Sequence, residues 1–143
     1  MKDVAQELES LLTSASRLQQ INEETAARKP APGKWSKKET LGHLIDSAAN
    51  HHQRLVRIQL QGTLDLPGYD GDEWVRVQRY QNLPWSEIIE LWRMYNRHLA
   101  QIIRNVDADA LKHTWKAPEG QTVDLEFIMR DYVVHMKHHL DQI

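Results

Sequence analysis

The stretch Asp131-Tyr-Val-Val-His-Met-Lys-His-His-Leu-Asp-Gln-Ile143 contains neither glycine nor proline and favours a helix. It places His135 and His139 four residues apart. Residues i and i+4 lie one above the other on the same helical face, so the two imidazoles can converge on one metal ion. Any helix with two histidines can show this spacing, so the pair is a weak signal until a third ligand is found.

A second stretch, Lys34-Trp-Ser-Lys-Lys-Glu-Thr-Leu-Gly-His-Leu-Ile-Asp46, offers that third histidine. Ser36 and Glu39 have the spacing of a capping box, which begins a helix and places His43 near its start. At 100° per residue, His43 lies nearly opposite the centre of the helix's apolar stripe. Its face is therefore either solvated or the polar wall of a cleft.

Four amphipathic patterns predict an all-α protein, with helices near residues 2–23, 36–61, 84–105 and 122–143. The third pattern is the clearest, and its apolar residues alternate spacings of four and three: Ile88, Trp92, Tyr95, Leu99, Ile102 and Val106. Thr122 is the expected N-cap of the fourth helix. Strand signals are weak. We expect one four-helix domain over residues 1–143, with a long connection between the second and third helices that includes a short helix near 72–80.

The two histidine stretches can meet only in one arrangement of their helices. His43 lies roughly 10 Å into the second helix and His135 roughly 20 Å into the fourth, at 1.5 Å per residue. The early part of one helix faces the late part of the other only if the two run antiparallel. Packed helices lie about 8–10 Å apart, a gap that two inward imidazoles and a metal ion can span. A shared site thus requires this antiparallel pairing.

Composition limits the class of protein. Of the 143 residues, 41% are apolar and 27% are charged, and the net charge is -2. These values are ordinary for a globular domain and give no general attraction to nucleic acid. There is no apolar run long enough for a membrane span and no signal-peptide pattern at the N-terminus, so we expect a cytoplasmic protein. The absence of cysteine excludes disulfides and a cysteine nucleophile.

The combined motifs resemble the DinB-like superfamily of four-helix proteins, which includes the YfiT-type metal-dependent hydrolases. The resemblance rests on Lys34-Trp35-Ser36, Glu39, Gly42-His43-Leu44, Asp46-Ser47, Leu83-Pro84-Trp85 and Tyr132-Val-Val-His135-x-x-His138-His139-x-x-Gln142-Ile143. It implies an up-down-down-up bundle, in which the second and fourth helices are antiparallel. It also implies a metal triad of His43, His135 and His139. His138 falls between the ligand positions and is not part of the implied set.

Other residues could take part in such a site. His51 and His52 are alternative ligands, which we interpret as packing residues. Asp46 and Asp131, each one turn from a histidine of the triad, could hold a ring N–H or could be exposed helix carboxylates. Three imidazoles suit Zn, Ni, Cu or Fe, and we expect zinc or nickel as the divalent ion.

These observations leave three hypotheses for function. The first is a metal-dependent hydrolase that attacks a small-molecule substrate with metal-activated water. The second is a metal-dependent S-transferase that uses a low-molecular-weight thiol cosubstrate, as some relatives in the superfamily do. The third is a non-catalytic metal-binding domain. We also expect a homodimer, because family members often dimerise and because Leu60, Leu64 and Leu66 are surplus apolar residues around a loop.

Overall fold

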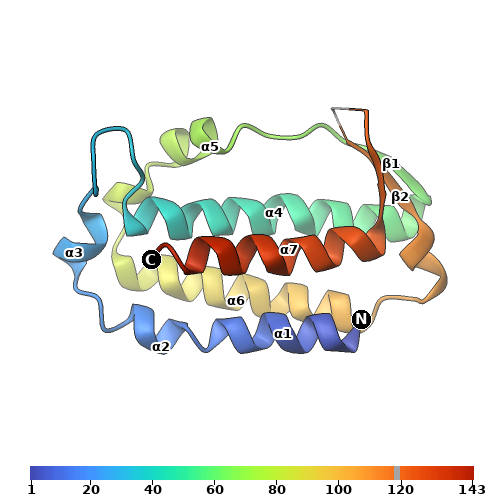
Figure 1. Ribbon diagram of the computed structural model, residues 1–143, viewed down its shortest axis with the longest axis horizontal. Coiled ribbons are helices and arrows are strands. Elements are labelled where there is room, and N and C mark those ends of the chain that lie inside the picture. The colour runs from blue at the N-terminus through green and yellow to red at the C-terminus, as the bar shows by residue number, and fades with distance from the viewer. Residues whose placement is uncertain (118–119) are drawn as a thin grey trace.

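The computed structural model describes residues 1–117 and 120–143, and it shows a bundle of four long helices (Figure 1). These are α1 (Lys2–Leu12), α4 (Lys37–Gln61), α6 (Trp85–Arg104) and α7 (Leu125–Leu140). Helices α1 and α7 run in one direction along the bundle, and α4 and α6 run in the other (Figure 1). The predicted up-down-down-up topology is confirmed, and α4 is antiparallel to α7.

The first helical segment differs from the prediction of one helix over residues 2–23. It is divided into α1, α2 (Ala15–Leu18) and α3 (Glu23–Ala27). The Thr13 hydroxyl donates to the Ser10 carbonyl at 2.7 Å, where α1 ends. Hydroxyl side chains that bond to the backbone in this way compete with helix continuation. Asn22 then caps α3 by accepting from the Thr25 N–H at 2.8 Å.

The start of the last helix also differs from prediction. Asp124, and not Thr122, is the N-cap of α7, and its carboxylate accepts from the Phe127 N–H at 2.8 Å. Thr122 instead begins a strand. Strands β1 (Thr63–Asp65), β2 (Thr114–Lys116) and β3 (Thr122–Asp124) form a small sheet in which β2 is central, parallel to β1 and antiparallel to β3.

The long connection between α4 and α6 contains β1, the expected short helix as α5 (Gly71–Gln78), and a 3-10 turn, η1 (Tyr80–Asn82). A second 3-10 turn, η2 (Asp109–Lys112), precedes β2. Leu64, counted in the sequence as surplus apolar surface, is buried in β1 with 2% of its surface exposed, whereas Leu60 is 80% exposed.

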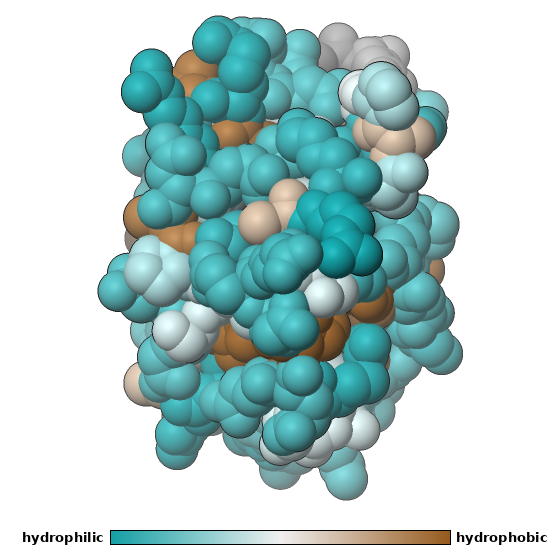
Figure 2. Space-filling model, turned by 90° about the vertical axis from the view of Figure 1, so that its left-hand side faces the viewer, coloured by the Kyte–Doolittle hydropathy of each residue, from teal (hydrophilic) through white to brown (hydrophobic). Residues whose placement is uncertain are grey.

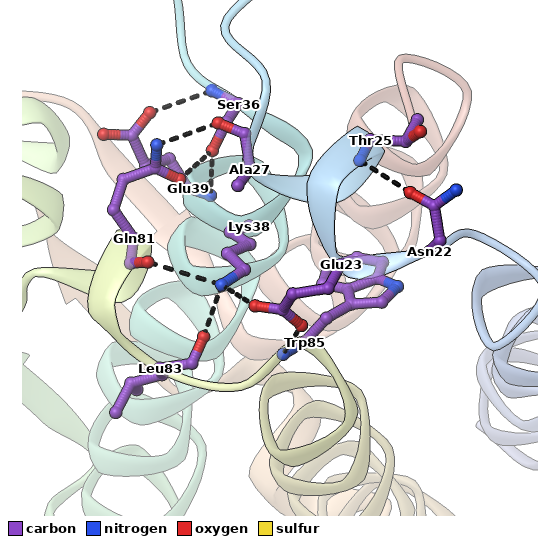
Figure 3. Close-up of polar contacts among 10 residues, drawn as sticks. All are labelled: Asn22, Glu23, Thr25, Ala27, Ser36, Lys38, Glu39, Gln81, Leu83 and Trp85. Atoms are coloured by element: carbon purple, nitrogen blue, oxygen red, sulfur yellow. Dashed lines mark hydrogen bonds and ion pairs between the residues drawn. The ribbon is translucent and has the colours of Figure 1, made fainter.

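The N-terminus of α4 is held by the predicted capping box (Figure 3). Ser36 Oγ accepts from the Glu39 N–H at 3.2 Å, and Glu39 Oε2 accepts from the Ser36 N–H at 2.8 Å. Lys29 pairs with the same carboxylate at 2.9 Å. These bonds satisfy N–H groups that a helix start leaves without partners.

Lys38, in the first turn of α4, connects this helix to α3 and to the segment that precedes α6 (Figure 3). Its buried ammonium pairs with Glu23 and donates to the Leu83 carbonyl at 2.6 Å. Glu23 in turn accepts from the Trp85 N–H at 2.9 Å. The end of α4 that carries His43 is therefore fixed by polar bonds as well as by packing.

The core lies between the four long helices and follows their apolar stripes. Trp92 of α6 and Tyr132 of α7 are the largest fully buried side chains. The Tyr132 hydroxyl donates to the buried Asn96, and Asn96 donates to the Trp92 carbonyl at 2.8 Å. No helix in the described part of the chain is long and apolar enough to cross a membrane.

Candidate metal centre

The antiparallel packing of α4 and α7 brings His43, His135 and His139 together. Each offers a ring nitrogen, and the three nitrogens all lie within 4.8 Å of one another. The Nε2 atoms of His43 and His135 are 3.4 Å apart. The ring centres are separated by 5.3 Å for His43 and His135, 4.8 Å for His43 and His139, and 4.6 Å for His135 and His139.

The cluster is enclosed enough to keep its rings neutral. His43 is 8% exposed, and the other two histidines are half-buried. Burial, with the neighbouring histidines, lowers the pKa of His43 from 6.5 to about 4. Burial, with the charges of His139 and His138, lowers the pKa of His135 to about 4 as well. Burial also lowers the pKa of His139. At neutral pH all three rings can offer a lone pair.

The sequence left open whether the face of His43 is solvated or forms the wall of a cleft, and the structure shows a wall. The ring centre of Trp35 lies 4.9 Å from that of His43 and 6.5 Å from that of His139. Tyr69, from the connection before α5, lies 6.4 Å from His43 in a stacked orientation. At Gly71 a Cβ would lie 3.2 Å from His43 Cε1, so the start of α5 closes directly over the ring.

Sequence reasoning missed Trp35, Tyr69 and Gly71 as parts of this enclosure. Trp35 was visible as the residue before the Ser36 cap. Asp70 preceding Gly71 was also visible as a start signal for α5, since Asp70 accepts from the Glu73 N–H at 3.1 Å. Neither signal indicates that Trp35 or the start of α5 packs over His43 of α4.

Asp46 and Asp131 make no hydrogen bond to the three histidines within the described ranges. Asp46 is buried, and its Oδ1 accepts from the Tyr80 hydroxyl at 2.6 Å and from Gln78 Nε2 at 2.5 Å. Burial raises its pKa, against the effect of these two donors. Asp131 is exposed. The group near His135 Nδ1 is instead the Ser47 hydroxyl, at 3.5 Å.

The remaining histidines of these helices have other neighbours. His51 Nδ1 lies 2.8 Å from the Ser47 carbonyl, and its ring packs 4.5 Å from that of Tyr132. His52 Nδ1 lies 3.2 Å from the Tyr95 hydroxyl. His138 is exposed, and its Nε2 lies 2.9 Å from Gln142 Nε2. All three thus lie outside the cluster that the sequence selected.

A cavity of about 440 Å³ has Trp35 in its lining, and the ring of Trp35 also lies 4.9 Å from that of His43. The cavity is lined by Pro30, Gly33, Lys34, Trp35, Thr40, Asp72 and Gln142. Much of this lining comes from residues 30–40, at the end of the bundle that Figure 2 shows, where hydrophilic residues cover most of the surface. None of the three histidines is among the residues that line this cavity.

The donor set fits a divalent ion. Two nitrogens bound tetrahedrally at 2.0–2.1 Å from zinc lie about 3.3–3.4 Å apart, which matches the His43–His135 separation. The buried Nδ1 atoms of His43 and His139 have no hydrogen-bond partner in the described part of the chain. Buried polar atoms are normally bonded, so these two rings are incompletely satisfied by the protein alone.

The fold and the histidine cluster together define an all-α bundle with the donor set of a metal protein. The sequence-family model of the DinB superfamily matches residues 6–143, so the chain belongs to that superfamily.

Two curated proteins are similar to this chain in sequence, and their names describe metal-dependent hydrolases. "Putative metal-dependent hydrolase BH0277" of Halalkalibacterium halodurans is 23% identical over 146 residues, covering 99% of this chain and 85% of that protein. "Putative metal-dependent hydrolase OB0782" of Oceanobacillus iheyensis is 26% identical over 123 residues, covering 86% of this chain and 71% of that protein.

Among solved structures, the chain is similar to YfiT from Bacillus subtilis, described as a probable metal-dependent hydrolase with an unusual four-helix bundle topology. The TM-score is 0.82 at 22% identity, over 99% of this chain and 83% of the other. This likeness supports the fold.

Proposed function

We propose that His43, His135 and His139 bind one divalent metal ion, zinc or nickel, and that the protein is a metal-dependent hydrolase of small molecules. The observation that carries this proposal is the 3.4 Å approach of two Nε2 atoms from α4 and α7, beside a third imidazole. The same approach could be a hydrogen bond between two neutral rings. A hydrogen bond would join only these two rings, whereas a metal ion bound by neutral imidazoles also accounts for the third ring nitrogen, from His139, beside them.

The chemistry follows from the number of ligands. His43, His135 and His139 would hold a divalent ion with one position left open, and the ion would supply activated water as a nucleophile there. The protein's own residues hold and shield this position. Ser47 contacts the far side of the His135 ring, and Trp35, Tyr69 and Gly71 limit the access of bulk water to His43.

A hydrolysis assay with a panel of small esters, amides and lactams tests the proposal. Turnover should be lost on chelation and restored by zinc or nickel, while the helical circular dichroism stays largely unchanged because the apolar stripes form a core of their own. The His43→Ala variant should not be restored, and the His138→Ala variant should behave like the wild type. Turnover that survives chelation would contradict the proposal.

The same panel, run with and without a low-molecular-weight thiol, separates hydrolysis from S-transfer. A hydrolase turns substrates over in water alone, whereas a transferase requires the thiol and incorporates it into the product.

A further inference from the structure

Helix α4 contains two buried cationic side chains, Lys38 at 3% and Arg54 at 7% exposure, and the two differ in their polar partners. Lys38 has a carboxylate and carbonyl partners. Arg54 has no carboxylate within ion-pair distance among residues 1–117 and 120–143, and its Nε is enclosed without a hydrogen-bond partner there. Burying a cation without an anion is unfavourable, so the lack of a carboxylate partner for Arg54 among the described residues requires an explanation.

Other arginines of the chain contrast with Arg54. Each of several exposed or half-buried guanidinium groups lies within ion-pair distance of a carboxylate: Arg28, Arg76, Arg93, Arg104 and Arg130. Arg54, although buried, has no such carboxylate among the described residues.

Arg54 is held in a form that suits anion recognition. Its guanidinium carbon lies 4.1 Å from the ring centre of Trp115. The Trp115 indole is itself fixed, because its N–H donates to the Leu66 carbonyl at 2.9 Å. A guanidinium stacked on an aromatic ring keeps its planar fork of N–H donors at its edge, and that fork matches the two oxygens of a carboxylate or phosphate.

Arg54 is also connected to the histidine cluster. The Ser47 hydroxyl lies 3.5 Å from His135 Nδ1 and 3.3 Å from His51 Nδ1. Arg54 follows His51 by three residues in α4, so the two side chains are neighbours on one helical face. A row of polar side chains therefore leads along α4 from the cluster to Arg54.

Tyr69 lies over the same row. It stacks beside His43, and although burial chiefly raises its pKa, the charge of Arg54 acts on it in the opposite direction. His43 and Arg54 are eleven residues apart in the sequence. That spacing is about 16 Å along the helix axis. A single ligand that contacts both the cluster and Arg54 must therefore span about 16 Å.

We propose that Arg54 binds the anionic oxygens, carboxylate or phosphate, of a substrate whose reactive group lies at the His43–His135–His139 cluster. The inference names the class of substrate and in that respect rests on the proposed function. Anion binding at Arg54 itself does not require the metal, because the guanidinium and the Trp115 ring form the subsite.

Nuclear magnetic resonance of the full chain tests the subsite through the Nε–H signal of Arg54 and the indole N–H signal of Trp115. Benzoate, neutral benzamide and inorganic phosphate are titrated separately into metal-free and zinc-loaded protein. We expect saturable shifts of both signals with benzoate, with phosphate, or with both, and none with benzamide. The anion that binds more tightly shows whether the subsite prefers a carboxylate or a phosphate.

Variants separate this site from surface charge. Arg54→Gln should weaken anion binding about tenfold or more, since hydrogen bonds to charged groups are stronger than neutral ones. Arg54→Lys keeps the charge without the fork and should bind at an intermediate level. Arg57→Gln is the matched control, because Arg57 is exposed on the same helix and bonds to Gln53, and it should bind as the wild type does.

Three results would overturn the proposal: no shift of the two signals with either anion, equal shifts with benzamide, or unchanged binding by Arg54→Gln. If Arg54→Gln does not fold, the titrations of the wild type and of Arg54→Lys test the proposal. Failure of zinc to bind would contradict the proposed function and leave the metal-free titrations interpretable. Normal zinc binding without anion binding would contradict only the subsite.

Discussion

The Nε2 atoms of His43 and His135 lie 3.4 Å apart although the residues are separated by 92 positions in the sequence. Their approach depends on the antiparallel packing of α4 and α7 and on the depth of each ring along its helix. His139 joins them because it follows His135 by four residues, about one helical turn. The site is thus a product of the bundle, and changes that shift α4 or α7 test it as directly as changes of the ligands.

The ring of Tyr80 packs directly against α4 at Gly42. A Cβ at Gly42 would lie 2.2 Å from Tyr80 Cδ2, so Gly42→Ala must displace the ring and disturb the Tyr80–Asp46 hydrogen bond. We expect a loss of about 1–3 kcal/mol in the free energy of unfolding, despite the higher helix propensity of alanine. Urea denaturation measures it. In a Tyr80→Ala background the same change should cost nothing, and equal losses in both backgrounds would refute the steric explanation.

Lys38 should matter more to stability than its partner Glu23. Lys38→Ala removes the donor of the Leu83 and Gln81 carbonyls. The expected loss in the free energy of unfolding is about 2 kcal/mol. The side chain of Glu23 is 59% exposed, so water can replace much of what Glu23→Gln removes, and its loss should be smaller. Thermal and urea unfolding compare the two. A larger effect for Glu23→Gln would show that the pair, and not the carbonyl contacts, dominates.

The metal-free protein should lose stability as the pH falls through the range set by its buried histidines. Burial lowers the pKa of His43 and His135 from 6.5 to about 4. Between these values the folded protein binds fewer protons than the unfolded chain, so the contribution of these rings to stability is fully present above about pH 6.5 and decreases as the pH falls toward 4. His135→Gln should flatten this dependence. Parallel curves for variant and wild type would show that His135 does not contribute.

The homodimer expected from the sequence remains a prediction. Leu60 is 80% exposed, and Val77, Phe127 and Val134 are also exposed apolar residues, although Leu64 is buried and no longer supports the idea. Light scattering should give twice the 16.7 kDa mass of the chain, and Leu60→Lys should shift the population toward the single chain if Leu60 lies in the interface. A single-chain mass at concentrations where the protein is otherwise well behaved would reject the dimer.

The sequence was informative where a pattern extends over several turns. The stripes of α4 and α6 predicted both helices to within one residue, and the same stripes placed the histidines at matching depths. The pattern was less useful at short or local features. Strands of three residues, as in β1, β2 and β3, are too short to show alternation. The hydroxyl bond of Thr13 and the cap at Asp124 shifted helix ends that periodicity alone could not locate.

The enclosure of the site depended on contacts between distant segments. Periodicity put His43 opposite the apolar stripe of its helix, but the covering by Trp35, Tyr69 and Gly71 comes from segments outside α4. Arg54 was missed for a similar reason. Its spacing from His43, Ser47 and His51 is that of one helical face, yet only the structure shows that it is buried beside Trp115 without a carboxylate among the described residues.

Metal content is the most direct test of the central claim that His43, His135 and His139 form a metal site. Purified wild-type protein, loaded with zinc or nickel and freed of excess ion, is compared by elemental analysis with the variant in which all three histidines are alanine and with His138→Ala. The account predicts about one ion per chain for the wild type and for His138→Ala, and a small fraction of that for the triple variant. A triple variant that is folded by circular dichroism and still holds one ion per chain would contradict the assignment and direct attention to His51, His52 and His138.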